Sequence, residues 1–206
     1  MPRRLLITLI LVLTAFGVAV SSASATQRTP QRSGPQGAGF YDSWKWFKDT
    51  YWIVPPSGVY SVLHSANTNT FQVIRGQTVF HITDYFNGYW TGSVVVKITR
   101  AQVPSCQTVL GQVTPDGHVF MTMYDATTGL VRNNPVGMMV KVKRQWTMVN
   151  QMTSAAGSDG TSTLSHWAYM VQSKEGDRSY ARLPFSGQSI PDFMSSCPPG
   201  PMINRP

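Results

Sequence analysis

The sequence of 206 residues carries 17 Lys and Arg against 9 Asp and Glu, a formal net charge of +8 at pH 7. The basic residues are scattered and form no block of about five or six like charges, which favours a solvated positive surface over a nucleic-acid-binding tract. Glu175 is the only glutamate, and this argues against a glycosidase site built from paired carboxylates.

The N-terminus has the features of an export signal. Two arginines precede a mostly apolar run over residues 5–20, and three small residues ending at Ala25 match the pattern that signal peptidase reads. A membrane helix is the alternative, but the run is shorter than the about 20 residues that a span requires. We expect residues 1–25 to be cleaved, which would leave a periplasmic or secreted protein without a membrane span.

Cys106 and Cys197 are the only cysteines, and in an oxidising compartment an even pair predicts a disulfide. Closing a loop of about 90 residues stabilises a fold by roughly 4 kcal/mol in the chain-entropy model. Two distant thiolates make a poor metal site, so we expect no metal there.

Composition divides the exported chain into three parts. Residues 26–39 hold no large apolar side chain and predict a flexible linker. Residues 198–206 are similarly Pro-rich and predict a disordered tail. The remaining residues, 40–197, have the size of a single domain.

The domain begins with an aromatic segment. Phe40, Trp44, Phe47 and Tyr51 recur at helical spacing, which predicts a short helix that packs its aromatic face on the rest of the fold.

After this segment, runs rich in Val, Thr, Tyr, Phe and Trp alternate with turn residues. The pattern predicts an all-β antiparallel meander of about eight strands that closes into a barrel, with a β-sandwich as the alternative. Strands are expected near residues 51–54, 59–64, 70–75, 78–85, 89–98, 107–114, 118–125, 136–152 and 162–172.

Residues 84–90, DYFNGYW, gather four aromatic rings around an Asn-Gly turn. A two-residue loop would mix apolar and polar residues on both faces of the hairpin, whereas a three-residue loop over 86–88 sorts them. With the second arrangement, Asp84 and Trp90 face the barrel interior. The outer side then holds a possible interaction patch at the hairpin tip: Tyr85, Phe86 and Tyr89.

The run over residues 136–152 alternates well enough to predict one long strand. Arg144 falls in phase with the apolar Trp146, so it is expected to point inward, or to extend to a barrel end with its stem packed on Trp146. An inward Arg and an inward Asp would have to pair or bind something, because unpaired burial of charge is costly. The predicted ligand-binding residues are Asp84, Trp90, Arg144 and Trp146.

No catalytic motif is present, whether a nucleophile elbow, a zinc-binding HExxH or a phosphate-binding loop. The histidines occur singly, without metal-ligand spacing. Methionine pairs such as Met121 and Met123 could ligate Cu(I), but core packing explains them more simply. We therefore predict no catalytic residue, no metal and no cofactor.

The chain resembles the lipocalin and avidin type of small exported meander barrel over roughly residues 40–173. The resemblance is architectural: the lipocalin Gly-x-Trp motif is missing, since Trp44 follows Asp42-Ser43 and Trp52 follows Thr50-Tyr51. It implies a cup able to hold a small molecule, and it supplies neither ligand nor activity.

Three functions follow as hypotheses. The leading one is an exported, non-enzymatic barrel that binds a small, partly apolar ligand. The alternative is an envelope protein-interaction or structural module that uses the aromatic hairpin tip, and a barrel enzyme of unknown chemistry comes third. Nucleic-acid binding is disfavoured because no Lys or Arg lies between Arg75 and Lys97, around the aromatic cluster.

Overall fold

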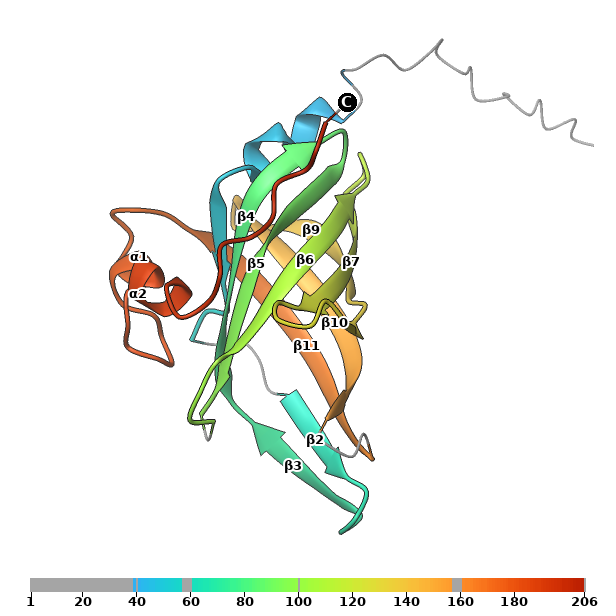
Figure 1. Ribbon diagram of the computed structural model, residues 1–206. Coiled ribbons are helices and arrows are strands. Elements are labelled where there is room, and N and C mark those ends of the chain that lie inside the picture. The colour runs from blue at the N-terminus through green and yellow to red at the C-terminus, as the bar shows by residue number, and fades with distance from the viewer. Residues whose placement is uncertain (1–38, 40, 57–60, 100, 157–160, 206) are drawn as a thin grey trace, which may run out of the picture. The chain divides into compact units, whose positions relative to one another are not determined.

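The computed structural model describes residues 39, 41–56, 61–99, 101–156 and 161–205 (Figure 1). The predicted signal peptide, its cleavage site and all of the predicted linker except Gly39 lie outside the described residues. Within the described ranges, no helix has the length and apolar composition that crossing a bilayer requires.

Strands make up most of the described chain, and its helices are short. In chain order the elements are η1 (Asp42–Phe47), β1 (Thr50–Ile53), β2 (Ser61–Ser65), β3 (Thr70–Ile74), β4 (Gly76–Phe86), β5 (Tyr89–Ile98), β6 (Ser105–Val113), β7 (His118–Asp125), β8 (Val131–Asn133), β9 (Val136–Val142), β10 (Gln145–Ala156), β11 (Ser162–Ser173), α1 (Arg178–Ala181) and α2 (Ile190–Met194).

Eight of these strands form a closed antiparallel barrel. They follow one another around the wall in the order β1-β4-β5-β6-β7-β9-β10-β11, and β11 pairs with β1 to close the ring. Closure gives every wall strand a paired neighbour on both sides, whereas an open sheet leaves the outer edges of its two end strands unpaired. The predicted all-β meander barrel is therefore confirmed, and the β-sandwich alternative is not.

The strand pair β2–β3 extends the sheet beyond the closed part of the barrel (Figure 1). β1 and β2 lie end to end along β11, β1 pairing with residues 171–173 and β2 with residues 163–166. In the same way β4 pairs with β1, while β3 pairs with β2. The positions that β1 and β4 occupy in the wall are thus continued beyond the closed ring by β2 and β3.

Aromatic side chains fill the end of the barrel next to η1. Trp44 and Phe47 of η1 are buried there, and the Trp44 indole N–H donates a 2.9 Å hydrogen bond to the Thr114 carbonyl. The Trp44 ring centroid lies 5.0 Å from that of Trp146, and the Phe47 centroid lies 6.2 Å from that of Trp90. The predicted N-terminal aromatic helix is therefore present as a 3-10 turn that closes this end.

A second apolar cluster lies on the outside of the wall. Ile53, Val79 and Val95 project from β1, β4 and β5 against Leu183, Ile190 and Phe193 of the segment that carries α1 and α2. The Cys106–Cys197 disulfide, with a Cα–Cα distance of 5.4 Å, attaches the end of this segment to β6. The predicted bond is thus present.

The hairpin at DYFNGYW differs from the prediction. Asn87–Gly88 forms a two-residue turn with φ of 47° and 87°, so that Tyr85 pairs with Trp90. A bulge at Thr83 adds one residue to β4 and shifts its alternation between the two faces. The three-residue loop is therefore wrong: Asp84 faces outward and Tyr85 faces the interior.

The predicted long strand over residues 136–152 is also wrong, because it is a hairpin of β9 and β10. Lys143 and Arg144 form its two-residue turn, with φ of 48° and 70°. Arg144 is accordingly exposed at a turn rather than inward-facing. Because of this turn, the buried face of β9 carries Met139, whereas Val142 is 51% exposed.

The Pro-rich C-terminal segment has a defined path along β4 and β5, drawn in dark red in Figure 1. The Pro201 carbonyl accepts hydrogen bonds from the hydroxyls of Thr83 (3.0 Å) and Thr91 (2.7 Å). The Asp84 carboxylate accepts bonds from the Ile203 amide and the Arg205 guanidinium. Composition predicted disorder for this tail, but these polar contacts hold it against the outer wall.

Candidate ligand-binding site

The four residues predicted to bind a ligand do not come together. Trp90 and Trp146 both belong to the aromatic end of the barrel. Asp84 lies on the outer wall beneath the C-terminal segment, and Arg144 lies in the β9–β10 turn. None of the four lines the cavity described next.

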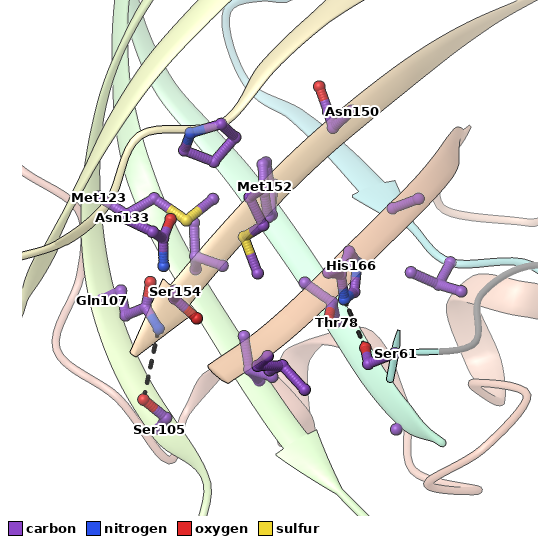
Figure 2. A pocket seen from close by; sticks show the side chains of 18 of the residues that line it. Ser61, Thr78, Ser105, Gln107, Met123, Asn133, Asn150, Met152, Ser154 and His166 are labelled. Atoms are coloured by element: carbon purple, nitrogen blue, oxygen red, sulfur yellow. Dashed lines mark hydrogen bonds between the residues drawn. The ribbon is translucent and has the colours of Figure 1, made fainter. Parts of the chain in front are cut away.

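The barrel encloses a cavity of about 220 Å³ on the side away from η1 (Figure 2). Most of its lining is apolar, and the apolar side chains come mainly from five strands, β4, β5, β7, β10 and β11. The principal apolar contributors are Phe80 of β4, Val94 of β5, Met121 and Met123 of β7, Met152 of β10, and Leu164, Ala168 and Met170 of β11. Flexible methionines make such a wall adaptable to the shape of a bound molecule.

Three amide side chains line the same cavity: Gln107 of β6, Asn133 of β8 and Asn150 of β10. Asn133 and Asn150 are only 8% and 4% exposed. The Gln107 Oε1, the Asn133 Oδ1 and both polar atoms of the Asn150 side chain make no hydrogen bond with any of the described residues. Buried polar atoms in native structures nearly always have a partner, so this concentration of unpaired groups indicates a binding surface.

The fold makes room for Asn150 through Gly137, its partner residue on β9. A Cβ at Gly137 would lie 2.1 Å from the Val149 carbonyl oxygen and 2.5 Å from Asn150 Oδ1. A glycine here allows the amide to lie flat against the neighbouring strand. The Asn150 side chain therefore has a dedicated place in the wall.

His166 of β11 and Ser61 of β2 form a polar pair on another wall of the cavity, with the His166 Nδ1 and the Ser61 hydroxyl 2.6 Å apart. Figure 2 shows this pair across the cavity from Gln107 and Asn133. Burial lowers the pKa of His166 to about 4, so the ring is neutral at pH 7. A serine beside a neutral histidine resembles two members of a catalytic triad, in which a third group orients the histidine as a base.

The described lining residues contain neither Asp nor Glu, and Arg75, exposed at the rim, is their one formally charged member. No carboxylate of the lining can therefore orient His166 as a base. Within the described ranges, no three His, Cys, Asp or Glu side chains gather closely enough to hold a metal ion. The chemistry on offer is hydrogen bonding by neutral groups within an apolar chamber.

The predicted interaction patch is divided by the register of the hairpin. Tyr85 is 8% exposed, and its hydroxyl donates a 2.6 Å hydrogen bond to the Tyr41 carbonyl. The expectation that Tyr85 is exposed is therefore wrong. Tyr89 is exposed on the outer wall, and Phe86 is partly exposed with the Arg205 guanidinium 5.4 Å from its ring centroid.

Sequence reasoning missed the cavity residues although their signal is of the kind it used. Asn150 is in phase with Trp146, Met148 and Met152 along β10, and His166 is in phase with Leu164 and Ala168 along β11. A polar residue in an otherwise apolar phase marks a buried polar group. The same signal failed for Asp84 and Arg144 because a bulge and a turn interrupt their strands.

Comparison with models of known protein families, with curated proteins and with solved structures finds no significant match to this chain.

Proposed function

We propose that this protein is an exported, non-enzymatic barrel that binds one small, partly apolar molecule in its interior cavity. The observation that carries the proposal is the combination of a largely apolar chamber with buried amide atoms that have no partner in the part of the chain that the structure describes. Specific small-molecule sites have this composition, with an apolar lining and a few fixed polar groups.

The aromatic end supports this role by giving the chamber a floor. Trp44, Phe47, Trp52 and Trp90 are each at most 4% exposed and pack edge to face or at a tilt. Such dense packing resists collapse of the neighbouring strands, because close-packed aromatic rings have little freedom to rearrange. The barrel thus combines a filled half with a hollow half.

The size of the cavity limits the ligand. An apolar cavity of about 150 Å³ is large enough to hold benzene, and the present one measures about 220 Å³. The proposed ligand is therefore either a ring system modestly larger than a single aromatic ring or a medium-length alkyl chain.

The disulfide is compatible with an oxidising compartment. Together with the N-terminal sequence, it supports the proposal that the protein acts in the periplasm or outside the cell. A protein-interaction role through the hairpin tip has less support, because Tyr85 is buried and Phe86 lies against Arg205.

A fluorescence titration with 1-naphthylamine, a two-ring dye that is uncharged at pH 7 and matches the size limit, tests the proposal. We expect saturable binding of one dye per protein. Ala168→Trp places a large ring in the cavity and should abolish that binding, whereas Ala155→Trp, on the exposed face of β10, should leave it unchanged. Leu164→Trp provides a second filling variant should Ala168→Trp fail to fold by circular dichroism.

Saturable binding that persists in both folded filling variants would place the dye outside the cavity and contradict the proposal. Absence of saturable binding to the unmodified protein would also contradict it.

A further inference from the structure

Among the buried side-chain polar atoms of the cavity, those of Asn150 are the ones that leave both a donor and an acceptor without a partner in the described residues. The Gln107 Nε2, by contrast, donates to the Ser105 hydroxyl at 3.5 Å. Gln107 and Asn133 each present one unpaired carbonyl oxygen. The unpaired set thus comprises three acceptor oxygens and one amino group.

This set defines what a ligand must bring. A carboxylate in the cavity would find these acceptor oxygens, one unpaired amino group and, among the described lining residues, no buried cation to neutralise it. The described lining residues other than the exposed Arg75 are formally neutral. Burial of an unpaired charge costs several kcal/mol. An anion is therefore disfavoured even if its shape fits the cavity.

An ammonium group is disfavoured for a related reason. Carbonyl oxygens can accept its hydrogen bonds, but neither Asp nor Glu occurs among the described lining residues to balance its charge. A hydroxyl or a primary amide, by contrast, donates and accepts at once and carries no charge. Such a group complements the two unpaired atoms of Asn150.

We infer that Asn150 is the polar anchor of the cavity and that it selects uncharged ligands whose apolar body carries a hydroxyl or amide group. The inference rests on the proposed function, since it names the class of ligand that the cavity takes. The Gln107 and Asn133 oxygens offer acceptor positions to a further donor on the same ligand.

The selectivity can be measured by displacement of bound 1-naphthylamine with compounds of matched length. Octan-1-ol and octanamide should displace the dye at concentrations at least tenfold lower than octanoate and octylammonium do. 1-Methoxyheptane contains the same number of carbon and oxygen atoms as octan-1-ol but lacks a donor. It should also be at least tenfold weaker than the alcohol.

Asn150→Leu should retain dye binding and lose the preference for octan-1-ol over 1-methoxyheptane. Asn134→Leu, a matched change at an exposed asparagine, should retain both. Equal displacement by alcohol, ether and octanoate in the unmodified protein would overturn the inference while leaving the proposed function intact. A preference for the alcohol that survives Asn150→Leu would overturn the role of Asn150. Failure of the dye to bind at all would instead contradict the proposed function, and the inference with it.

Discussion

The guanidinium of Arg205 donates a 2.7 Å hydrogen bond to the carboxylate of Asp84, 121 positions earlier in the chain. Asp84 is 1% exposed, and it also accepts a 3.2 Å bond from the Ile203 amide and lies 3.8 Å from the Lys48 ammonium. The carboxylate therefore holds the C-terminal segment on the outer wall instead of facing the interior. Asp84 is buried because the C-terminal segment lies over it.

Replacement of Asp84 should release the C-terminal segment. Asp84→Ala is expected to lower the free energy of unfolding by about 2–3 kcal/mol, because the Ile203 amide and the Arg205 guanidinium lose a charged acceptor. Arg205→Ala made in the Asp84→Ala background should cost almost nothing further, a coupling that urea denaturation of both single variants and the double variant would reveal. Additive effects would show that the two side chains act independently. Asp42→Ala, which breaks the exposed ion pair with Lys45, serves as a control expected to stay below about 1 kcal/mol.

The β9–β10 turn is a site of avoidable strain. Lys143 and Arg144 both have positive φ, a conformation that Asn and Gly adopt at much lower cost. Lys143→Asn combined with Arg144→Gly should raise the free energy of unfolding by about 1 kcal/mol, measured by urea denaturation.

The reciprocal change at the β4–β5 turn, Asn87→Lys with Gly88→Arg, should destabilise by more. A Cβ at Gly88 would lie 2.7 Å from the ring of Tyr41. A neutral or negative effect of the Asn-Gly substitution at 143–144 would contradict the turn assignment.

His166 should make the protein acid-sensitive. Its pKa is lowered to about 4 in the fold, against about 6.5 in an unfolded chain. Above pH 6.5 the ring is neutral in both states, so it has no effect. As the pH falls from about 6.5 toward 4, the unfolded state binds a proton that the folded state does not, and stability falls by up to about 2–3 kcal/mol. His166→Gln should flatten the pH dependence of the urea midpoint over this window, and the exposed His118→Gln should not.

The Cys106–Cys197 bond spans 91 positions and should contribute about 4 kcal/mol in the chain-entropy model. Cys106→Ser combined with Cys197→Ser is expected to lose most of that amount in urea denaturation. A reducing agent should lower the midpoint of the unmodified protein and leave that of the double variant unchanged. Equal midpoints for oxidised and reduced protein would show that the covalent link adds little to the contacts of the outer cluster.

Strand periodicity and turn residues were sufficient to predict the barrel, because alternation survives wherever a strand runs uninterrupted. On β5, for example, Trp90 was placed inward and is fully buried. Cysteine count alone predicted the disulfide. These features depend on local patterns that the finished fold preserves.

The errors have a common physical origin. The bulge at Thr83 and the turn at Lys143–Arg144 each change the phase of a strand by a local event without a glycine or proline at the site. α1 and α2, of four and five residues, are too short to show a helical period. The path of the C-terminal segment depends on a contact between Asp84 and Arg205 that no local pattern encodes. The cavity depends on the combined volume of inward side chains from several strands, which cannot be judged until the barrel geometry is known.

The most direct test of the account uses the methionines as reporters inside and outside the cavity. Met121, Met123, Met152 and Met170 line it, whereas Met138 and Met202 are 39% and 59% exposed on the outside. In protein labelled with ¹³C at the methionine methyl groups, titration with octan-1-ol should shift the NMR signals of the first four and leave the other two in place. Unchanged signals from the four lining methionines, or equal shifts at Met138 and Met202, would contradict an interior binding site.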